Sequence, residues 1–190
     1  MILKDTNKKK EIIKLAFETF YEQGFHATGV DKLLLESGIS KRTLYKYFSS
    51  KEDLIREAIV FYKKNFFNAM DLELKKRCKN PAKKIAAIFD MKYEKLKRRN
   101  YSGCFAVNAR IEFEGKNKEI ESECLQFVDQ LQNFIFKLCK EAKYKNPKKL
   151  SQQILILLQG TMIYSQSKRD PKIALIAKEV LKLMLMNSVK

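Results

Sequence analysis

Histidine, glycine and proline are scarce in this sequence, and tryptophan is absent. The 190 residues include one His, six Gly and three Pro. A Ser-His-Asp or Cys-His catalytic site would have to use His26, for which the sequence shows no partners. The few Gly and Pro leave little material for hairpins and loops. We therefore expect an all-α chain.

The cysteines lack the spacing of a metal site or of a disulfide scaffold. Cys78, Cys104, Cys124 and Cys139 are 26, 20 and 15 residues apart, with no CxxC pair. Structural zinc and a set of disulfides are both disfavoured by this pattern. No Gly-rich phosphate-binding loop is present either. The sequence predicts no metal and no cofactor, and it argues against an enzyme.

Long apolar segments are also missing. The longest strongly apolar run, residues 154–158, is far too short to span a bilayer. The first ten residues lead into an amphipathic segment, and no signal peptide is visible. We therefore expect a soluble cytoplasmic protein with no membrane contact.

Positive charge is abundant but unevenly placed. The net charge is +17, of which residues 1–55 contribute +2 and residues 56–190 contribute +15. One interpretation is a polyanionic partner, and the other is a lysine-rich composition set by a biased genome. In both cases the excess strengthens non-specific attraction to DNA at low salt.

The stretch after Gly38 combines the features of a short helix that contacts nucleic acid. Gly38 supplies a turn, and Ser40 is a good N-cap. Leu44 and Phe48 lie about 40° apart on a helical wheel and point inward, whereas Lys46 points roughly the other way. Cations in the first helical turn oppose the helix dipole unless an anion such as DNA phosphate faces them. The spacing is typical of a helix-turn-helix, and the alternative is a solvated surface helix.

Apolar residues recur at helical spacing along the rest of the chain. The sequence predicts about nine helices, over residues 7–23, 28–37, 40–48, 51–74, 81–96, 102–114, 118–143, 147–168 and 171–187. Thr28 is the expected cap of the second helix, and it serves either as a structural cap only or also as a phosphate contact. Gly160 lies within a helix, which suggests that a neighbouring helix approaches closely.

Residues 8–55 resemble the DNA-binding domain of the TetR family of bacterial transcriptional regulators. The most specific blocks are Ser37–Lys41, Thr43–Phe48 and Ser50–Leu54. The resemblance implies a three-helix helix-turn-helix head over residues 1–50, followed by a helical ligand-binding and dimerisation core over residues 51–190. It also implies that the DNA-contacting residues are Thr28, Lys41, Arg42, Thr43, Tyr45, Lys46, Tyr47 and Lys51.

The last two helices resemble the pair with which TetR-family members dimerise. This implies a homodimer through residues 147–187, and the alternative is that both helices only close the monomer core. Two recognition helices of a dimer would enter successive major grooves about 34–36 Å apart and read a pseudo-palindromic double-stranded DNA operator. We expect a transcriptional regulator, most simply a repressor released by a small hydrophobic effector. A non-specific nucleoid-type DNA-binding protein is the alternative from another class.

Candidate effector contacts are aromatic and apolar residues in the middle of the chain and in the penultimate helix, and most such residues are simply core. They are Phe67, Met70, Phe89, Tyr93, Phe105, Phe127, Leu131 and Tyr164. Cys104 is a second candidate: with Ser102 as cap it would occupy a first helical turn, near Arg98, Arg99 and Arg110 in sequence. Cys104, Asn108 and Glu112 share one helix face and resemble a subset of TetR-family regulators, some of which sense electrophiles or oxidants. An inert thiol in a structural hydrogen-bond cluster is the alternative.

Overall fold

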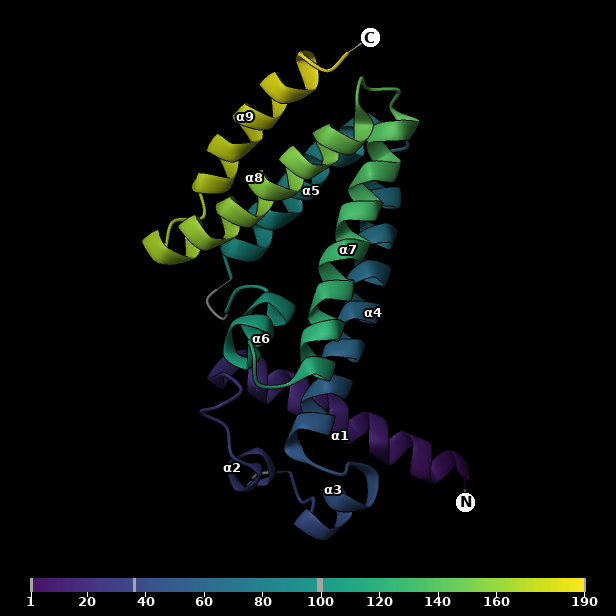
Figure 1. Cartoon of the computed structure of the whole chain (residues 1–190), viewed down its shortest axis with the longest axis vertical. Helices are drawn as coiled ribbons and strands as arrows, with labels where there is room; N and C mark the ends of the chain where they lie inside the picture. The colour runs from purple at the N-terminus through teal and green to yellow at the C-terminus, as the bar shows by residue number, and fades with distance from the viewer. Residues whose placement is uncertain (1, 36, 99–100, 190) are drawn as a thin grey trace. The chain divides into compact units, whose positions relative to one another are not determined.

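The computed structural model describes residues 2–35, 37–98 and 101–189, with the backbone alone for residues 2–6. These residues form nine α-helices and no strand, as Figure 1 shows. The all-α prediction and the predicted number of helices are therefore confirmed. The helices are α1 (Ile2–Gln23), α2 (Val30–Leu34), α3 (Lys41–Tyr47), α4 (Lys51–Arg77), α5 (Pro81–Leu96), α6 (Phe105–Phe113), α7 (Lys118–Glu141), α8 (Pro147–Lys168) and α9 (Ile173–Met186). No described helix is long and apolar enough to cross a membrane.

The chain divides into two compact units that each contain distant parts of the sequence. Unit 1 comprises residues 1–67 and 104–127, and unit 2 comprises residues 68–103 and 128–190. Both α4 and α7 run through the two units. The predicted boundary after residue 50 coincides with the start of α4, and as a functional division it stays a prediction.

Unit 1 has a core that joins the first three helices to α4, α6 and the start of α7. Ile12, Ala16 and Phe20 follow one another at helical spacing on α1 and are at most 1% exposed. Phe105 on α6 is equally buried, and its ring lies 5.0 Å from that of Phe17. The core of the N-terminal segment is therefore completed by a helix that follows much later in the sequence.

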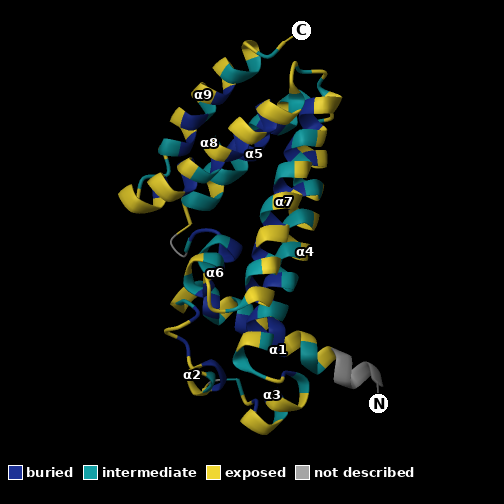
Figure 2. Cartoon of the chain, viewed as in Figure 1, coloured by how far each residue is buried: buried dark blue, intermediate teal, exposed yellow. Residues whose placement is uncertain are grey.

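Unit 2 is built around the packing of α5, α8 and α9. Phe89 on α5, Ile154 on α8 and Leu181 on α9 are fully buried. Lys178 on α9 forms an ion pair with Asp90 on α5, which adds a polar contact at the edge of this packing. In Figure 2, exposed positions recur along α8 and α9, so these helices are not buried on all sides.

Several helix ends differ from the prediction. The first helix begins at Ile2 rather than near residue 7, and α4 continues to Arg77 because no Gly or Pro interrupts it. The predicted α7 and α9 lose two residues or fewer at each end, and α8 has the bounds expected. Gly160 meets no heavy atom that a Cβ would contact. The expected close approach of a neighbouring helix is therefore wrong within the described chain.

Candidate nucleic-acid interface

The turn before α3 is held by hydrogen bonds of its own serines. The Ser37 hydroxyl donates to the Leu34 carbonyl and accepts from the Ile39 amide, at 2.9 and 3.1 Å. Gly38 has φ +65°, a left-handed conformation that favours glycine. Ser40 is then the N-cap of α3, and its hydroxyl accepts from the Thr43 amide at 3.1 Å. The predicted turn and cap are therefore confirmed, and they fix where α3 begins.

Two buried side chains set the orientation of α3. Leu44 is 0% and Phe48 is 2% exposed, and both belong to the core of unit 1. They lie on the inner side of the helix, as the four-residue spacing predicts. Arg42 and Lys46 are exposed, and Tyr45 is 50% exposed. Packing of the inner face thus leaves a basic and aromatic surface on the outside.

The basic residues of α3 differ in how they are held. The Lys41 ammonium lies 2.7 Å from an Asp31 carboxylate oxygen on α2, and hydrogen bonding to Asp31 raises the pKa of Lys41. The Lys46 ammonium lies 5.2 Å from the centre of the Tyr47 ring, within range of a cation–π interaction. The first turn of α3 contains no acidic residue. Cations there oppose the helix dipole, so a bound anion would be stabilised at this surface.

Two of the predicted DNA-contacting residues, Thr28 and Lys51, form hydrogen bonds to backbone carbonyls within unit 1. Thr28 does not cap α2, because the cap position is Gly29 and no side chain bonds there. The Thr28 side chain is fully buried, and its hydroxyl donates to the Gly24 carbonyl at 2.8 Å. Lys51 donates to the Phe25 carbonyl at 2.7 Å. The predicted cap at Thr28 is therefore wrong, and both DNA contacts stay predictions.

Glu112 on α6 binds the loop between α1 and α2, a contact that the sequence did not predict. The Glu112 carboxylate accepts from the backbone amides of Phe25 and His26, at 3.3 and 2.9 Å. The imidazole Nε2 of His26 lies 3.0 Å from the Glu112 carbonyl oxygen. The helical spacing predicts that Glu112 shares a face with Cys104 and Asn108, and a structural hydrogen-bond cluster is one alternative for that face. Its partners, 86 and 87 residues away, carry no signal in the sequence that identifies them.

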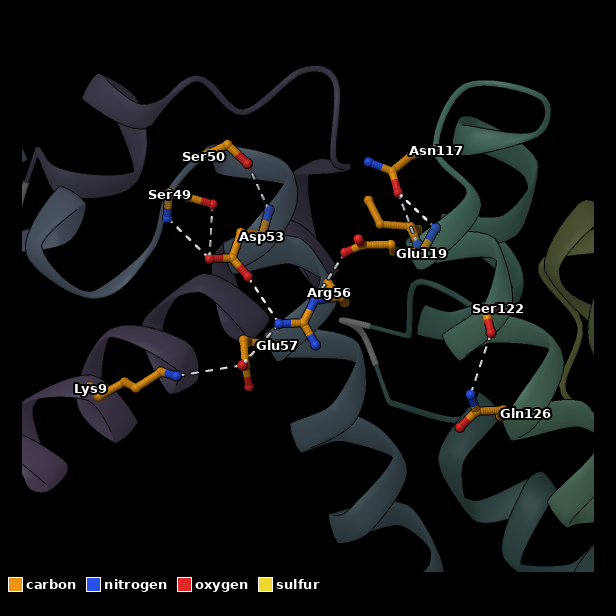
Figure 3. A network of polar contacts seen from close by, with 11 residues as sticks. Lys9, Ser49, Ser50, Asp53, Arg56, Glu57, Asn117, Glu119, Ser122 and Gln126 are labelled. Atoms are coloured by element: carbon orange, nitrogen blue, oxygen red, sulfur yellow. Dashed lines mark hydrogen bonds and ion pairs between the residues drawn. The ribbon is translucent and has the colours of Figure 1, made fainter.

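A polar network fixes the start of α4 next to α3 (Figure 3). The Ser50 hydroxyl accepts from the Asp53 amide at 3.0 Å, while the Asp53 carboxylate accepts from the Ser49 amide at 3.0 Å. The pattern resembles a capping box, except that the Asp53 carboxylate accepts from Ser49, the residue before the cap, and not from Ser50 itself. Arg56 donates to Asp53 at 3.0 Å, and it also lies 3.6 Å from Glu119 on α7. Burial opposes ionisation of Asp53, but the hydrogen bonds from Ser49 and Arg56 outweigh it and lower its pKa.

The eight predicted effector contacts are divided between the two units. Phe67, Phe105 and Phe127 lie in unit 1, where the rings of Phe67 and Phe127 are 5.6 Å apart. The other five, Met70, Phe89, Tyr93, Leu131 and Tyr164, lie in unit 2. Tyr164 is 54% exposed, whereas Phe89 is fully buried. An effector pocket lined by these residues stays a prediction. A separate open groove in unit 1 is polar, and its lining is Arg56, Lys118, Glu119, Ser122 and Glu123.

Cys104 lies one residue before α6 rather than inside its first turn. It is the N-cap residue, with φ −98° and ψ 116°, and its side chain makes no capping bond. Gly103, with φ +88°, interrupts the helical path that Ser102 was expected to start, so the predicted cap is wrong. The Cys104 sulfur is buried and lies 3.6 Å from the Tyr62 hydroxyl. Arg99, one of the expected neighbours, falls outside the described residues.

Two further cysteines, Cys124 and Cys139, are buried thiols, and the described chain has no cluster of metal ligands. No group of three or more His, Cys, Asp and Glu in it could hold a metal ion. Burial, with the neighbouring Cys104 adding to it, raises the pKa of Cys124 to about 12. Burial likewise raises the pKa of Cys139 to about 11. Both thiols are therefore protonated at neutral pH.

Known proteins match this chain most specifically in its N-terminal segment. Residues 12–58 match the family model of bacterial regulatory proteins, tetR family. The uncharacterized HTH-type transcriptional regulator YerO of Bacillus subtilis is 42% identical over 55 residues, which are 29% of this chain and 19% of YerO. The fatty acid metabolism regulator protein of Bacillus subtilis is 24% identical over 128 residues, which are 67% of this chain and 64% of the relative. The matched segments thus cover less than two thirds of these relatives.

The fold matches solved structures over nearly its whole length. A TetR-family transcriptional regulator from Cytophaga hutchinsonii has a TM-score of 0.87 at 13% identity, with 98% of this chain and 96% of that chain covered. The turn, the capped α3 and its exposed basic face, set in this all-helical fold, define a helix-turn-helix protein of the bacterial regulatory type. Residues 12–58 thus carry the DNA-binding segment of the TetR family, and the chain has the fold of a solved TetR-family regulator.

Proposed function

We propose that this protein is a DNA-binding transcriptional regulator, most simply a repressor, that reads its operator with α3. The single observation that carries the proposal is the orientation of α3, whose inner face is anchored by Leu44 and Phe48 while Arg42, Tyr45 and Lys46 are exposed. In a helix-turn-helix, the second helix enters the major groove with its exposed side chains against base edges. Lys41 and Tyr47, which have partners within unit 1, are then better suited to contact phosphates or to position α3.

A homodimer through α8 and α9 is part of the proposal. These helices and the tail that follows expose large apolar side chains, namely Ile156, Ile163, Tyr164, Leu175, Ile176, Val180, Leu183, Met186 and Val189. Gly160 is exposed, has open space around it and lies one helical turn from Ile156 and Tyr164. A partner helix could therefore approach this face closely. Covering it with the same face of a second copy would give a two-fold interface and two α3 helices.

Two α3 helices related by a two-fold axis would bind an inverted repeat. Their half-sites would be about 34–36 Å, or one helical turn of DNA, apart. A substitution of Gly160 by Leu should weaken the dimer and with it operator binding, while leaving the helical content unchanged. Analytical ultracentrifugation of the wild-type and Gly160→Leu proteins tests this step. A monomer in both cases at micromolar concentration would contradict the proposed dimer.

The proposal further holds that a small hydrophobic effector releases the protein from DNA. In unit 1, α6 bears Phe105, a candidate effector contact, and Glu112, which fastens the loop between α1 and α2. A ligand that displaces α6 would therefore act directly on the DNA-binding segment, and by linkage DNA would weaken ligand binding equally. Because one relative is named for fatty acid metabolism, acyl compounds are the first effectors to test. Effector release is seen as loss of the operator complex on addition of the ligand.

An alternative trigger is oxidation or alkylation of Cys104. In its favour, the thiol lies at the start of α6, beside the Tyr62 hydroxyl, on the helix that holds the α1–α2 loop. Modification of this buried group would disturb the packing of α6. Replacement of Cys104 by Ser should then abolish a response to peroxide or to an electrophile, whereas replacement of the half-buried Cys78, just after α4, should not.

Selection of bound sequences from a random DNA pool at physiological salt tests the proposed function. We expect an inverted repeat that the wild-type protein binds and the Lys46→Ala variant does not. A matched Lys64→Ala variant changes an exposed lysine outside α3 and should keep the preference. A pool that stays random would instead favour a nucleoid-type protein that coats DNA by charge.

A further inference from the structure

Most of the net charge is concentrated in two short segments that lie outside the DNA-binding head. Residues 75–84 and 137–149, 23 residues in all, contain twelve Lys or Arg and one Glu. They therefore carry +11 of the net +17, and the other 167 residues share the remaining +6. A lysine-rich composition alone would spread its lysines evenly. We call the Lys and Arg residues of these two segments the basic end.

The two segments meet at one end of unit 2. Residues 75–84 join α4 to α5, and residues 137–149 join α7 to α8. The helices α5 and α8 pack against each other, and Figure 1 shows that both begin where α4 and α7 end. The Lys145 amide also donates to the Ser188 carbonyl at 2.8 Å, which ties this end to the tail after α9. The charges are thus collected from distant parts of the sequence onto one surface.

Almost none of this charge is neutralised within the described chain. Only Lys75 and Arg77 form ion pairs there, with Asp71, Glu73 and Glu94. The six lysines of residues 137–149 are all exposed, and none forms an ion pair with a described residue. By contrast, Lys8 and Lys14 on α1 form ion pairs with Glu11 and Glu18.

The fold itself does not account for the positions of five lysines of the basic end. Cations in the last turns of α4 and α7 suit the helix dipole, but Lys83, Lys84, Lys148 and Lys149 occupy the first turns of α5 and α8. Neither first turn contains an acidic residue. Lys143 has φ +57°, where a glycine is favoured over any residue with a side chain. Five lysines thus stand where local structure prefers another residue, and a bound anion would compensate for four of them.

We propose that the basic end binds the phosphate backbone of a second DNA duplex, independently of its sequence. Phosphate contacts by lysine position DNA without reading bases. No large apolar side chain is exposed within residues 75–84 or 137–149, so the surface lacks the anchors that a protein inserts into a lipid interface. The charge and the absence of those anchors together fit a hydrated phosphate backbone. The choice of DNA among phosphate polymers rests on the proposed function, which brings the protein to DNA through α3.

The test separates the two DNA surfaces by substitution. In a protein with Arg42→Ala and Lys46→Ala, α3 no longer binds bases, and binding to a labelled duplex of random sequence is measured against salt. Two variants are then compared in that background, Lys148→Gln with Lys149→Gln, and Lys168→Gln with Lys172→Gln. Each removes two exposed positive charges, the first pair at the start of α8 and the second at or just beyond its end. The first pair removes charges that oppose the helix dipole, so the variant should fold at least as well as the parent.

The result expected is that the α3-deficient protein still binds the duplex at about 50 mM salt, and that Lys148→Gln with Lys149→Gln weakens this binding tenfold or more. The slope of log affinity against log salt should fall in magnitude by about 2, the value for two lost phosphate contacts. The Lys168 and Lys172 pair should change the affinity less than threefold. Equal losses for both pairs, or no binding by the α3-deficient protein, would overturn the proposal.

Two further arms identify the polyanion. Phosphatidylglycerol vesicles and an RNA duplex of equal length replace the DNA in the same titration. Tighter binding of the vesicles or of the RNA, lost in the Lys148 and Lys149 variant, would also overturn the assignment to DNA. Failure of the proposed function appears separately, as absence of any sequence preference by the protein with intact α3. A protein with both surfaces should in addition join a biotinylated random duplex to a fluorescent operator duplex on streptavidin beads.

Discussion

The α3 surface and the basic end both place lysines in first helical turns, but their surroundings differ. The α3 helix is capped by Ser40 and anchored by two buried residues, and hydrogen bonds of Ser50 and Asp53 fix the start of α4 that follows. One of its first-turn cations, Lys41, is held by Asp31. Apart from Lys75 and Arg77, the residues of the basic end form no ion pairs in the described chain. A surface that reads a sequence needs fixed side chains, whereas a surface that only collects phosphates does not.

The DNA-binding head and the basic end differ in net charge and in how firmly their side chains are positioned. The DNA-binding head has nearly balanced charge, because residues 1–55 contribute only +2. Its precision comes from polar contacts that reach other elements of unit 1, such as Glu112 on α6 and Arg56 on α4. The basic end has a large excess of charge and few such contacts. Substitutions should therefore disturb the first surface through geometry and the second through charge alone.

The largest expected effect on stability is at the anchor of α3. Phe48→Ala removes a ring that is 2% exposed, so the free energy of unfolding should fall by about 3–5 kcal/mol. At the basic end, Lys149→Ala should leave this quantity within about 0.5 kcal/mol of the wild type. Urea denaturation followed by circular dichroism measures both. A Phe48→Ala protein as stable as the Lys149→Ala protein would remove the proposed distinction between an anchored and an unanchored surface.

A smaller effect is expected at the link between α6 and the α1–α2 loop. Glu112→Ala leaves the Phe25 and His26 amides without their acceptor, and we expect a loss of about 1–3 kcal/mol. Hydrogen exchange at those two amides should accelerate more than exchange within α3. The control is Glu114→Ala, which removes an exposed partner of Arg110 and should have little effect. Unchanged exchange at both amides would show that Glu112 does not hold the loop.

Thr28→Val tests whether this residue serves the fold or the DNA. The substitution keeps the shape but removes the hydroxyl that donates to Gly24, so stability should fall by about 1 kcal/mol. Because the side chain is fully buried, operator affinity measured well below the unfolding temperature should change less than threefold. A much larger loss of operator affinity, with unchanged stability, would instead support the phosphate contact predicted for Thr28.

The smallest effect concerns pH and Asp53. The folded pKa of Asp53 lies below its ordinary value because hydrogen bonds from Ser49 and Arg56 outweigh burial. Its contribution to stability is therefore present above the unfolded pKa of about 4 and is lost as the pH falls through the lower folded pKa. Asp53→Asn should flatten the stability profile on this acid side while leaving most of the profile unchanged. A wild-type profile that Asp53→Asn does not alter would show that the carboxylate contributes nothing.

Much of the head could be predicted because its signals are local. Ser40 is four residues from Leu44 and three from Thr43, so cap, anchor and exposed face can be placed within a few helical turns. Helix starts predicted from a single capping residue were wrong in two cases. Thr28 and Ser102 have side chains that can cap a helix, but the N-cap residues of α2 and α6 are Gly29 and Cys104. Propensity at one residue does not decide which backbone path a loop takes.

The remaining features depend on contacts between distant segments. Glu112 meets the α1–α2 loop across more than 80 residues, and no periodicity predicts that contact. The basic end was visible in the sequence only as excess lysine, because residues 75–84 and 137–149 become neighbours when α5 and α8 pack together. Candidate effector contacts such as Phe105 are proposed because they are aromatic or apolar. Residues of the hydrophobic core are aromatic or apolar as well, so residue type alone does not distinguish the two.

The most direct measurement compares operator and scrambled DNA side by side for two variants. Lys46→Ala should lower affinity for the operator by about 1–3 kcal/mol and leave affinity for the scrambled duplex nearly unchanged. Lys148→Gln with Lys149→Gln should lower affinity for the scrambled duplex and reduce its salt dependence, whereas affinity for the operator, which α3 binds, should stay nearly unchanged. Equal losses on both duplexes for Lys46→Ala would contradict the assignment of sequence reading to α3.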